Sequence, residues 1–115
     1  MQYLLLIYAD QKKIQTLSQE KLGEMMQAYM TYTEKLRSDG VYLGSNRLRP
    51  VETASSVRVH GGQPNVVNGP FAETREQLGG YYLIEAKDDK AAQHYAGLCP
   101  GAAVGTMEVR PVWQM

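Results

Sequence analysis

The chain has 115 residues, the size of one ordinary domain, and we expect a single domain over residues 1–115. It carries 12 Lys plus Arg and 12 Asp plus Glu, so its formal net charge is zero. This balance argues against nucleic acid or a membrane surface as a partner. Residues 1–9 are apolar but too short for a signal peptide or a membrane span. A single cysteine, Cys99, leaves no internal disulfide and suits a reducing cytoplasm, where we expect this protein.

The first half of the chain predicts two strands around a long helix. Residues 2–9 form an apolar run in which both alternating sets are hydrophobic, so this strand should be covered on both faces. Residues 17–39 predict a helix that Thr16 caps, with Gln19 as its capping-box partner, and that Gly40 ends. Residues 41–48 predict the next strand. The apolar stripe of the helix comprises Leu22, Met25, Met26, Tyr29, Thr33 and Leu36.

The second half predicts a hairpin, a strand, a shorter helix and a last strand. Residues 54–60 should form a strand with Val57 and Val59 inward, and residues 65–67 a short return strand. Residues 80–86 and 104–113 predict further strands. Between them, Asp88 or Asp89 should cap a helix that runs to about Leu98 and ends at Pro100-Gly101. The packing side of this helix comprises Ala91, Ala92, Tyr95 and Ala96.

This order of elements predicts an α+β fold, a ferredoxin-like split βαβ sandwich with an extra hairpin. Two helices can cover only one face of a four-stranded sheet, whereas the first strand is apolar on both faces. A second copy of the chain would cover the other face, so we expect a homodimer with two sheets facing each other.

Residues 68–82 combine three glycines, a proline, three ionisable groups and three aromatic residues. This mixture predicts a turn that places polar side chains beside a strand. The glycine spacing fits neither a P-loop nor a dinucleotide fingerprint. The charged triplet Glu73, Arg75 and Glu76 is either a solvated turn with an ion pair or a rim that orients a polar ligand, with Arg75 binding an anion.

Strand alternation suggests where a ligand could bind. Arg58 and His60 share one face of their predicted strand, and Thr106, Glu108 and Arg110 share one face of the last. Either set could form ion pairs at a dimer interface or a polar patch in a tyrosine-lined cavity, since the chain has eight tyrosines. The candidate ligand-binding residues are Arg58, Asn68, Arg75, Tyr82, Glu108 and Arg110.

Evidence for catalysis is sparse in this sequence. His60 and Glu73 are the candidate catalytic residues, and His94 is expected on a helix surface. Two isolated histidines lack the spacing of metal ligands, so we expect no metal and no cofactor. Cys99 is expected to be a packed thiol, since no positive charge adjoins it in sequence.

The run Asn68-Gly-Pro-Phe-Ala-Glu-Thr-Arg-Glu76, followed by Leu78-Gly-Gly-Tyr-Tyr82, resembles the motif of YCII-related proteins of the DGPF type. Residues 2–8 and 105–112 resemble the same family, so the similarity runs nearly end to end. The resemblance implies a dimeric α+β barrel whose biochemical role is largely undefined. Relatives of this fold include small enzymes that isomerise lactones or oxidise polycyclic aromatics, and some family members accompany sigma-factor genes.

The chain departs from this motif at its first position. The family motif begins with aspartate, and a histidine–aspartate pair has been proposed as acid and base in the broader YCII group, whereas this chain has Asn68. An asparagine has no proton to exchange near neutral pH, so it cannot serve as the base. It can still hold the turn.

Three functions therefore remain open, and whether the protein is an enzyme is undecided. We favour a cytoplasmic dimer that binds a small organic ligand between its sheets. The second reading is a cofactor-independent isomerase or lyase that uses His60 or Glu73, with Arg75 or Arg110 stabilising an anion. The third, implied only by the family, is an accessory protein of the transcription machinery.

Overall fold

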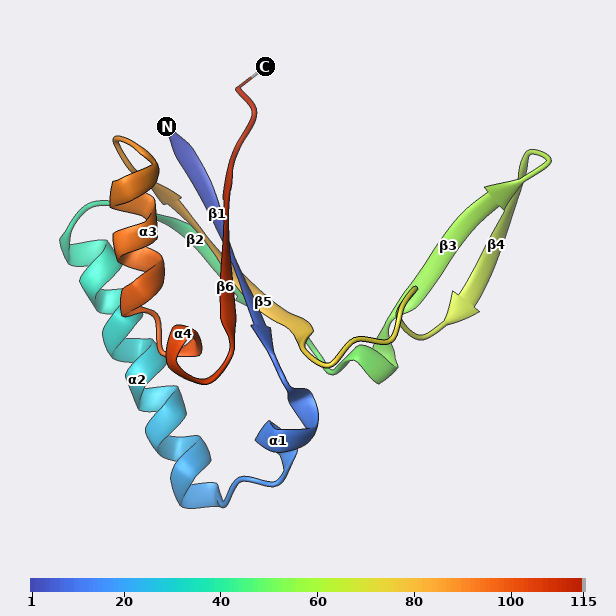
Figure 1. Ribbon diagram of the computed structural model, residues 1–115, viewed down its shortest axis with the longest axis horizontal. Coiled ribbons are helices and arrows are strands. Elements are labelled where there is room, and N and C mark those ends of the chain that lie inside the picture. The colour runs from blue at the N-terminus through green and yellow to red at the C-terminus, as the bar shows by residue number, and fades with distance from the viewer. Residues whose placement is uncertain (115) are drawn as a thin grey trace.

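The structure is a computed structural model and describes residues 1–114. Within these residues, six strands, four α-helices and one 3-10 helix follow one another (Figure 1). Their bounds are β1 Gln2–Ala9, α1 Gln11–Gln15, α2 Gln19–Ser38, β2 Tyr42–Arg47, η1 Val51–Thr53, β3 Ser55–His60, β4 Gln63–Asn68, β5 Gln77–Glu85, α3 Asp89–Leu98, α4 Gly101–Val104 and β6 Thr106–Pro111.

Four of the strands form one antiparallel sheet in the order β2-β5-β1-β6. The apolar strand β1 lies in the middle of this sheet, where it pairs with β5 on one side and β6 on the other. The helices α2 and α3 lie together on one face of the sheet, which Figure 1 shows edge-on. This arrangement confirms the predicted ferredoxin-like α+β fold.

The core lies between the sheet and the two long helices. Every second residue of β1, namely Tyr3, Leu5 and Ile7, is buried there, and Leu36 of α2 and Ile84 of β5 complete the centre. The side chains of Leu4, Leu6 and Tyr8 point the other way and are only half-buried. The expectation that β1 is covered on both faces is therefore met on one face only within a single chain.

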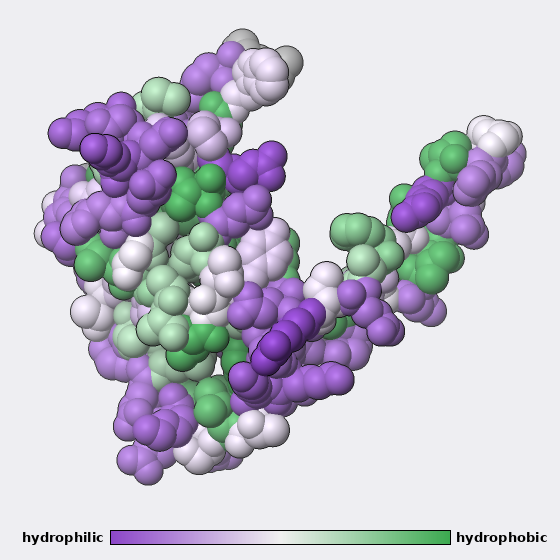
Figure 2. Space-filling model, viewed as in Figure 1, coloured by the Kyte–Doolittle hydropathy of each residue, from purple (hydrophilic) through white to green (hydrophobic). Residues whose placement is uncertain are grey.

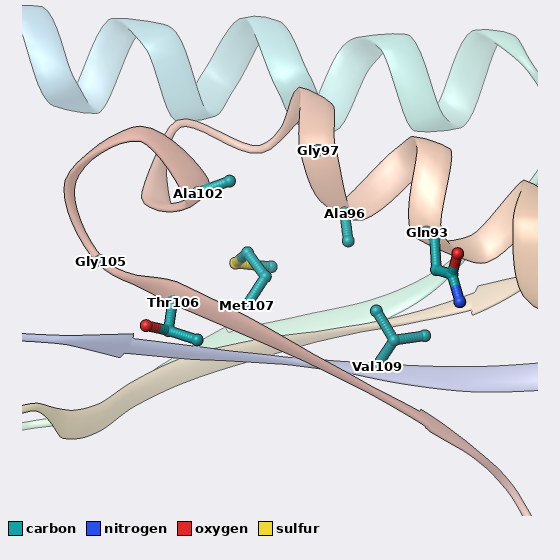
Figure 3. Close-up of a pocket in the computed structure, with 8 residues that line it drawn as sticks. All are labelled: Gln93, Ala96, Gly97, Ala102, Gly105, Thr106, Met107 and Val109. Atoms are coloured by element: carbon teal, nitrogen blue, oxygen red, sulfur yellow. The ribbon is translucent and has the colours of Figure 1, made fainter.

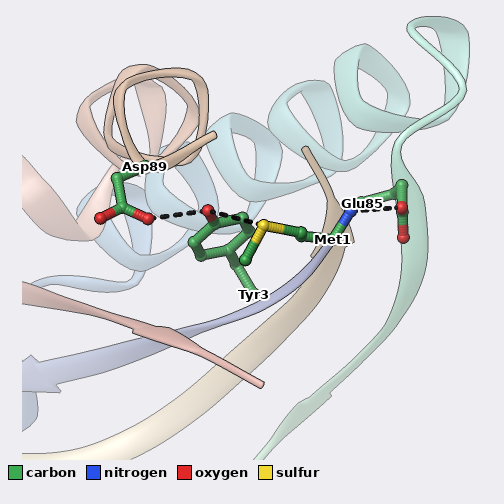
Figure 4. A network of polar contacts seen from close by, with 4 residues as sticks. All are labelled: Met1, Tyr3, Glu85 and Asp89. Atoms are coloured by element: carbon green, nitrogen blue, oxygen red, sulfur yellow. Dashed lines mark hydrogen bonds and ion pairs between the residues drawn. The ribbon is translucent and has the colours of Figure 1, made fainter. Parts of the chain in front are cut away.

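Polar contacts fasten the start of the chain to α3 and to the end of β5. The Tyr3 hydroxyl donates a hydrogen bond to Oδ1 of Asp89, 2.7 Å away, in the first turn of α3 (Figure 4). The amino group of Met1 lies 2.7 Å from Oε1 of Glu85 on β5. Asp88 caps α3 by accepting from the backbone N–H of Ala91, as one of the two predicted caps would.

The cap predicted for the long helix is wrong. The helix begins at Gln19, and Ser18 is its N-cap because its hydroxyl accepts from the N–H of Lys21. The hydroxyl of Thr16 instead donates to the carbonyl of Lys13, at the end of a short helix α1 that the sequence analysis missed. The short helix α4 was also missed, and it begins where Pro100-Gly101 ends α3.

Most of the tyrosines belong to the covered side of the sheet. Tyr32 packs edge-on against Tyr82, with ring centroids 5.0 Å apart. The Tyr32 hydroxyl donates to the carbonyl of Tyr95 at 2.8 Å, and the Tyr82 hydroxyl shares a 2.7 Å hydrogen bond with Thr33. The tyrosine count thus reflects a core with satisfied hydroxyls more than a wet cavity.

The strands β3 and β4 form a separate two-stranded hairpin that projects from the body (Figure 1). We call residues 55–68 the arm. Gly61 and Gly62 form its tip with φ values of 55° and 79°, which favour glycine in the tight turn. Val57 and Val59 are not inward as predicted, since both are exposed, although they do lie on the opposite face from Arg58 and His60. The return strand is longer than predicted.

Candidate functional site

The sheet has one face without helices, and we call it the uncovered face. Antiparallel pairing places Leu4 opposite Leu83 and Leu6 opposite Tyr81, and it places the polar residues of β6 beside them. These side chains alternate with the buried ones on the two central strands, β1 and β5. The uncovered face comprises Leu4, Leu6, Tyr8, Asn46, Tyr81, Leu83, Glu108 and Arg110.

Polar groups flank the apolar centre of the uncovered face on two sides. On β6, Nη1 of Arg110 lies 3.4 Å from Oε2 of Glu108, and the two side chains are 67% and 41% exposed. On the opposite side, Nδ2 of Asn46 donates to the Tyr81 hydroxyl at 2.8 Å. The face therefore offers an apolar floor with one cation, one carboxylate, one amide and two phenols. This is the type of surface that lines small-molecule sites.

Tyr8 connects the apolar floor to the charged pair. Burial against its neighbours raises the pKa of the Tyr8 phenol, and the carboxylate of Glu108 raises it further. The Arg110 guanidinium opposes this shift more weakly. Tyr8 is therefore a neutral phenol near neutral pH, able to donate a hydrogen bond to Glu108 or to a ligand.

The turn in the 68–82 motif contacts the sheet where it runs into β5. The Thr106 hydroxyl donates to Oε1 of Glu76 at 2.7 Å, and Thr106 stands opposite Tyr8 in the sheet. The side chain of Gln77 accepts from the N–H of Gln11 at 3.0 Å, which joins the same segment to α1. The predicted turn therefore ends at residue 76, because β5 begins at Gln77.

The candidate residues from the sequence fall into four places. Glu108 and Arg110 lie on the uncovered face, whereas Tyr82 is buried on the helix-covered side. The arm carries Arg58, His60 and Asn68, and the exposed link between the arm and β5 carries Glu73 and Arg75. A single chain thus brings together only Glu108 and Arg110, and the roles of the other candidates stay predictions.

Three residues of the uncovered face were missed as site residues. Tyr8 lies on β1, next to the strand that carries Glu108 and Arg110, whereas Tyr81 on β5 and Asn46 on β2 lie toward the far side of the same face. Because every second residue of a strand points to the same face, the sequence alone places Tyr8 on one face with Leu4 and Leu6. Asn46 and Tyr81 required the register between β2 and β5, including an irregularity between Tyr42 and Gly44.

Two shallow pockets lie away from this face. One, of about 380 Å³, opens between α3, α4 and the edge strand β6, and its lining is mostly small or apolar, including Ala96, Ala102 and Met107 (Figure 3). The other, of about 620 Å³, lies along α2 near Leu98 and Pro100. The first pocket has no charged residue in its lining, whereas the second has Glu24 and Lys35 along α2. We retain the uncovered face as the candidate site because there a charged pair adjoins the apolar centre of the sheet.

The described residues outside the uncovered face offer neither a reactive thiol nor a metal site. Burial raises the pKa of the Cys99 thiol, so Cys99 is a protonated core residue and a poor nucleophile. Within residues 1–114, no cluster of three His, Cys, Asp or Glu side chains could hold a metal ion. The same residues contain no helix that is long and apolar enough to cross a membrane.

Comparison with known proteins identifies the family of this chain. The YCII-related domain family matches the chain over residues 1–115. An uncharacterised protein of Rhizobium meliloti (strain 1021) is 33% identical over 114 residues, which cover 97% of this chain and 92% of that protein. The chain therefore belongs to the family of YCII-related domains.

Proposed function

We propose that this protein, as a DGPF-type member of its family, forms a cytoplasmic homodimer through the uncovered faces of two sheets and binds a small organic ligand between them. The observation that carries the proposal is the composition of the uncovered face. Leu4, Leu6 and Leu83 form an apolar centre that a monomer would leave in water. The buried free thiol of Cys99 suits a reducing compartment.

The spacing of packed sheets supports a ligand site at this seam. Two sheets that pack face to face lie about 10 Å apart, a distance that side chains of both sheets fill. The leucines can interdigitate at the centre. At the margins, Arg110, Glu108 and Tyr8 of each chain would line a polar recess, which fits a ligand with an apolar body and an acidic group bound by Arg110.

An acid–base enzyme is the second candidate, and the pairing of Tyr8 with Glu108 favours it. A carboxylate beside a neutral phenol could move a proton to and from a bound substrate. The earlier candidates His60 and Glu73 would need to reach this seam from the arm and the link. Asn68 has no carboxylate, so a reaction that depends on the aspartate of the family motif has lost its base.

A thermal-shift screen with small aliphatic and aromatic carboxylic acids tests the ligand proposal. An acid present at about 100 times its Kd should stabilise the folded protein by about 2.7 kcal/mol. Arg110→Gln should abolish the shift, whereas the control Arg37→Gln, on the helix-covered side, should keep it. No shift across the panel, or equal shifts in both variants, would contradict an acid-binding site at Arg110.

A further inference from the structure

The arm has an apolar face that none of the described residues 1–114 covers. In the β3–β4 register, Val57 stands opposite Val66 and Val59 stands opposite Pro64, so these four side chains share one face. Val57, Val59 and Val66 are 58%, 66% and 61% exposed. The other face carries Arg58 and His60. The arm is thus amphipathic, although no element of the body packs on its apolar side.

An isolated hairpin of this kind needs a partner to be stable. A two-stranded hairpin is marginal in water unless a further strand or layer covers its apolar face. Here the hydrogen bonds of the arm are internal to residues 54–69, including the N–H of Gly69 to the carbonyl of Ala54 at 2.7 Å and the Ser56 hydroxyl to the Gly69 carbonyl at 2.8 Å. We therefore expect the order of the arm to depend on contacts from outside its own chain.

The position of the arm indicates what covers it. The arm extends away from the sheet on the side opposite α2 and α3, which is the side of the uncovered face (Figure 1). Figure 2 shows a broad hollow between the arm and the body, with apolar side chains along the arm. A second sheet that packed on the uncovered face would enter this hollow and come alongside the arm.

We propose that the arm clasps a second copy of this chain, with the Val57, Val59, Pro64 and Val66 face packed against the partner subunit. This inference rests on the proposed dimer and adds a second contact to it. By two-fold symmetry each chain gives one arm and receives one, so the arm contacts are continuous with the contact between the sheets.

The area of the contact favours this arrangement. A stable interface buries about 800 Å² per partner. The outline of a four-stranded sheet with strands of about six residues is about 400 Å², given the usual strand spacing and rise. Because side chains project from the sheet, the surface area that it buries exceeds this outline. The sheet face alone nevertheless buries little compared with the area of a stable interface. If each chain also packs its arm on the partner and contacts the partner's arm, the area buried per chain rises toward that of a stable interface.

Charge and backbone chemistry favour packing of side chains over other modes of contact. The Val face carries no charge and the chain is neutral overall, so two copies do not repel each other. Pro64 has no N–H to offer another strand, which disfavours growth of the hairpin by strand addition along β4.

Lysine substitutions on the two faces of β4 test the proposal in the full-length chain. Val66→Lys places a charge on the apolar face and should raise the dimer dissociation constant about tenfold or more in sedimentation equilibrium. Asn65→Lys adds the same charge one residue away on the other face and should change it less than about threefold. Equal effects of the two substitutions would overturn the proposal.

Hydrogen exchange of the wild-type arm separates this inference from the dimer itself. Backbone amides of residues 55–68 should be protected at concentrations where the protein is dimeric and should exchange faster in the Leu6→Glu monomer. A dimer with an unprotected arm would overturn the clasp and leave the contact between the sheets intact. Equal protection in the monomer would also overturn the clasp, whereas a monomeric wild type would overturn both proposals.

Discussion

The Thr106 hydroxyl donates a hydrogen bond to Oε1 of Glu76 at 2.7 Å and thereby joins the end of the turn in the 68–82 motif to β6, the last strand of the chain. These residues are 30 positions apart in sequence. The contact fastens the link that follows the arm to the strand that carries Glu108 and Arg110. The motif therefore acts here as an anchor between the arm and the uncovered face.

Removing this anchor should cost stability. Glu76→Ala should lower the free energy of unfolding by about 1 kcal/mol, since it removes a hydrogen bond to a charged acceptor at a partly exposed position. Glu73→Ala is the matched control, because Glu73 is exposed and makes no hydrogen bond within residues 1–114; we expect it to stay within about 0.5 kcal/mol of the wild type. Chemical denaturation measures both, and similar values would show that Glu76 anchors nothing.

The hydrogen bond between Tyr3 and Asp89 should make the free energy of unfolding fall as the pH rises above 10. The hydrogen bond to the Asp89 carboxylate, followed by burial, raises the pKa of Tyr3 to about 12, above its ordinary value of 10.0. Between these values the unfolded chain loses this proton before the folded chain does, so the contribution is complete below pH 10 and is lost toward pH 12. The difference in unfolding free energy between the wild type and Tyr3→Phe should therefore shrink over this range.

A pH series of denaturation curves on both proteins checks this, and taking the difference removes the contribution of the other tyrosines. A constant difference from pH 8 to pH 12 would mean that Asp89 does not hold the Tyr3 proton.

Two glycines should respond to alanine in opposite directions. A Cβ at Gly105 would overlap the backbone carbonyl of Tyr8, where the last strand begins against β1, so Gly105→Ala should destabilise by about 1–3 kcal/mol. Gly97 lies within α3 with open space around it, and Gly97→Ala should stabilise by about 0.5–1 kcal/mol through helix propensity. Melting temperatures should shift down for the first and up for the second, and a tolerated Gly105→Ala would contradict the close approach to Tyr8.

Asn68 should tolerate the aspartate of the family motif. It lies exposed at the end of β4, opposite Ser55 on β3. Asn68→Asp should therefore change the free energy of unfolding by less than about 0.5 kcal/mol. Thermal unfolding measures this directly. A larger loss would mean that the amide itself holds the turn into Gly69, whose φ is 99°.

Local chemistry in the sequence was enough to predict most elements of the body. The apolar run of β1, the glycine that follows α2 and the aspartate cap of α3 each act within a few residues, and each lies close to where it was expected. The cap of α2 was misplaced because Thr16 and Ser18 are both good caps, and the choice depends on α1. Short helices such as α1 and α4 carry too few residues for a periodic signal.

The candidate site was less predictable because it depends on contacts distant in sequence. Glu108 and Arg110 were placed together by strand parity alone. The contact between Asn46 and Tyr81, on the far side of the same face, depends on pairing between β2 and β5, which no local pattern encodes. Val57 and Val59 were expected inward because alternation separates two faces of a strand without indicating whether anything covers either face.

The oligomeric state tests the central claim most directly. Sedimentation equilibrium at micromolar concentration should give a dimer for the wild type and a monomer for Leu6→Glu, which places a charge at the centre of the uncovered face. Met30→Glu, at an apolar residue of α2 that is already 61% exposed, should remain a dimer. A monomeric wild type, or a Leu6→Glu variant that dimerises as the wild type does, would contradict the account.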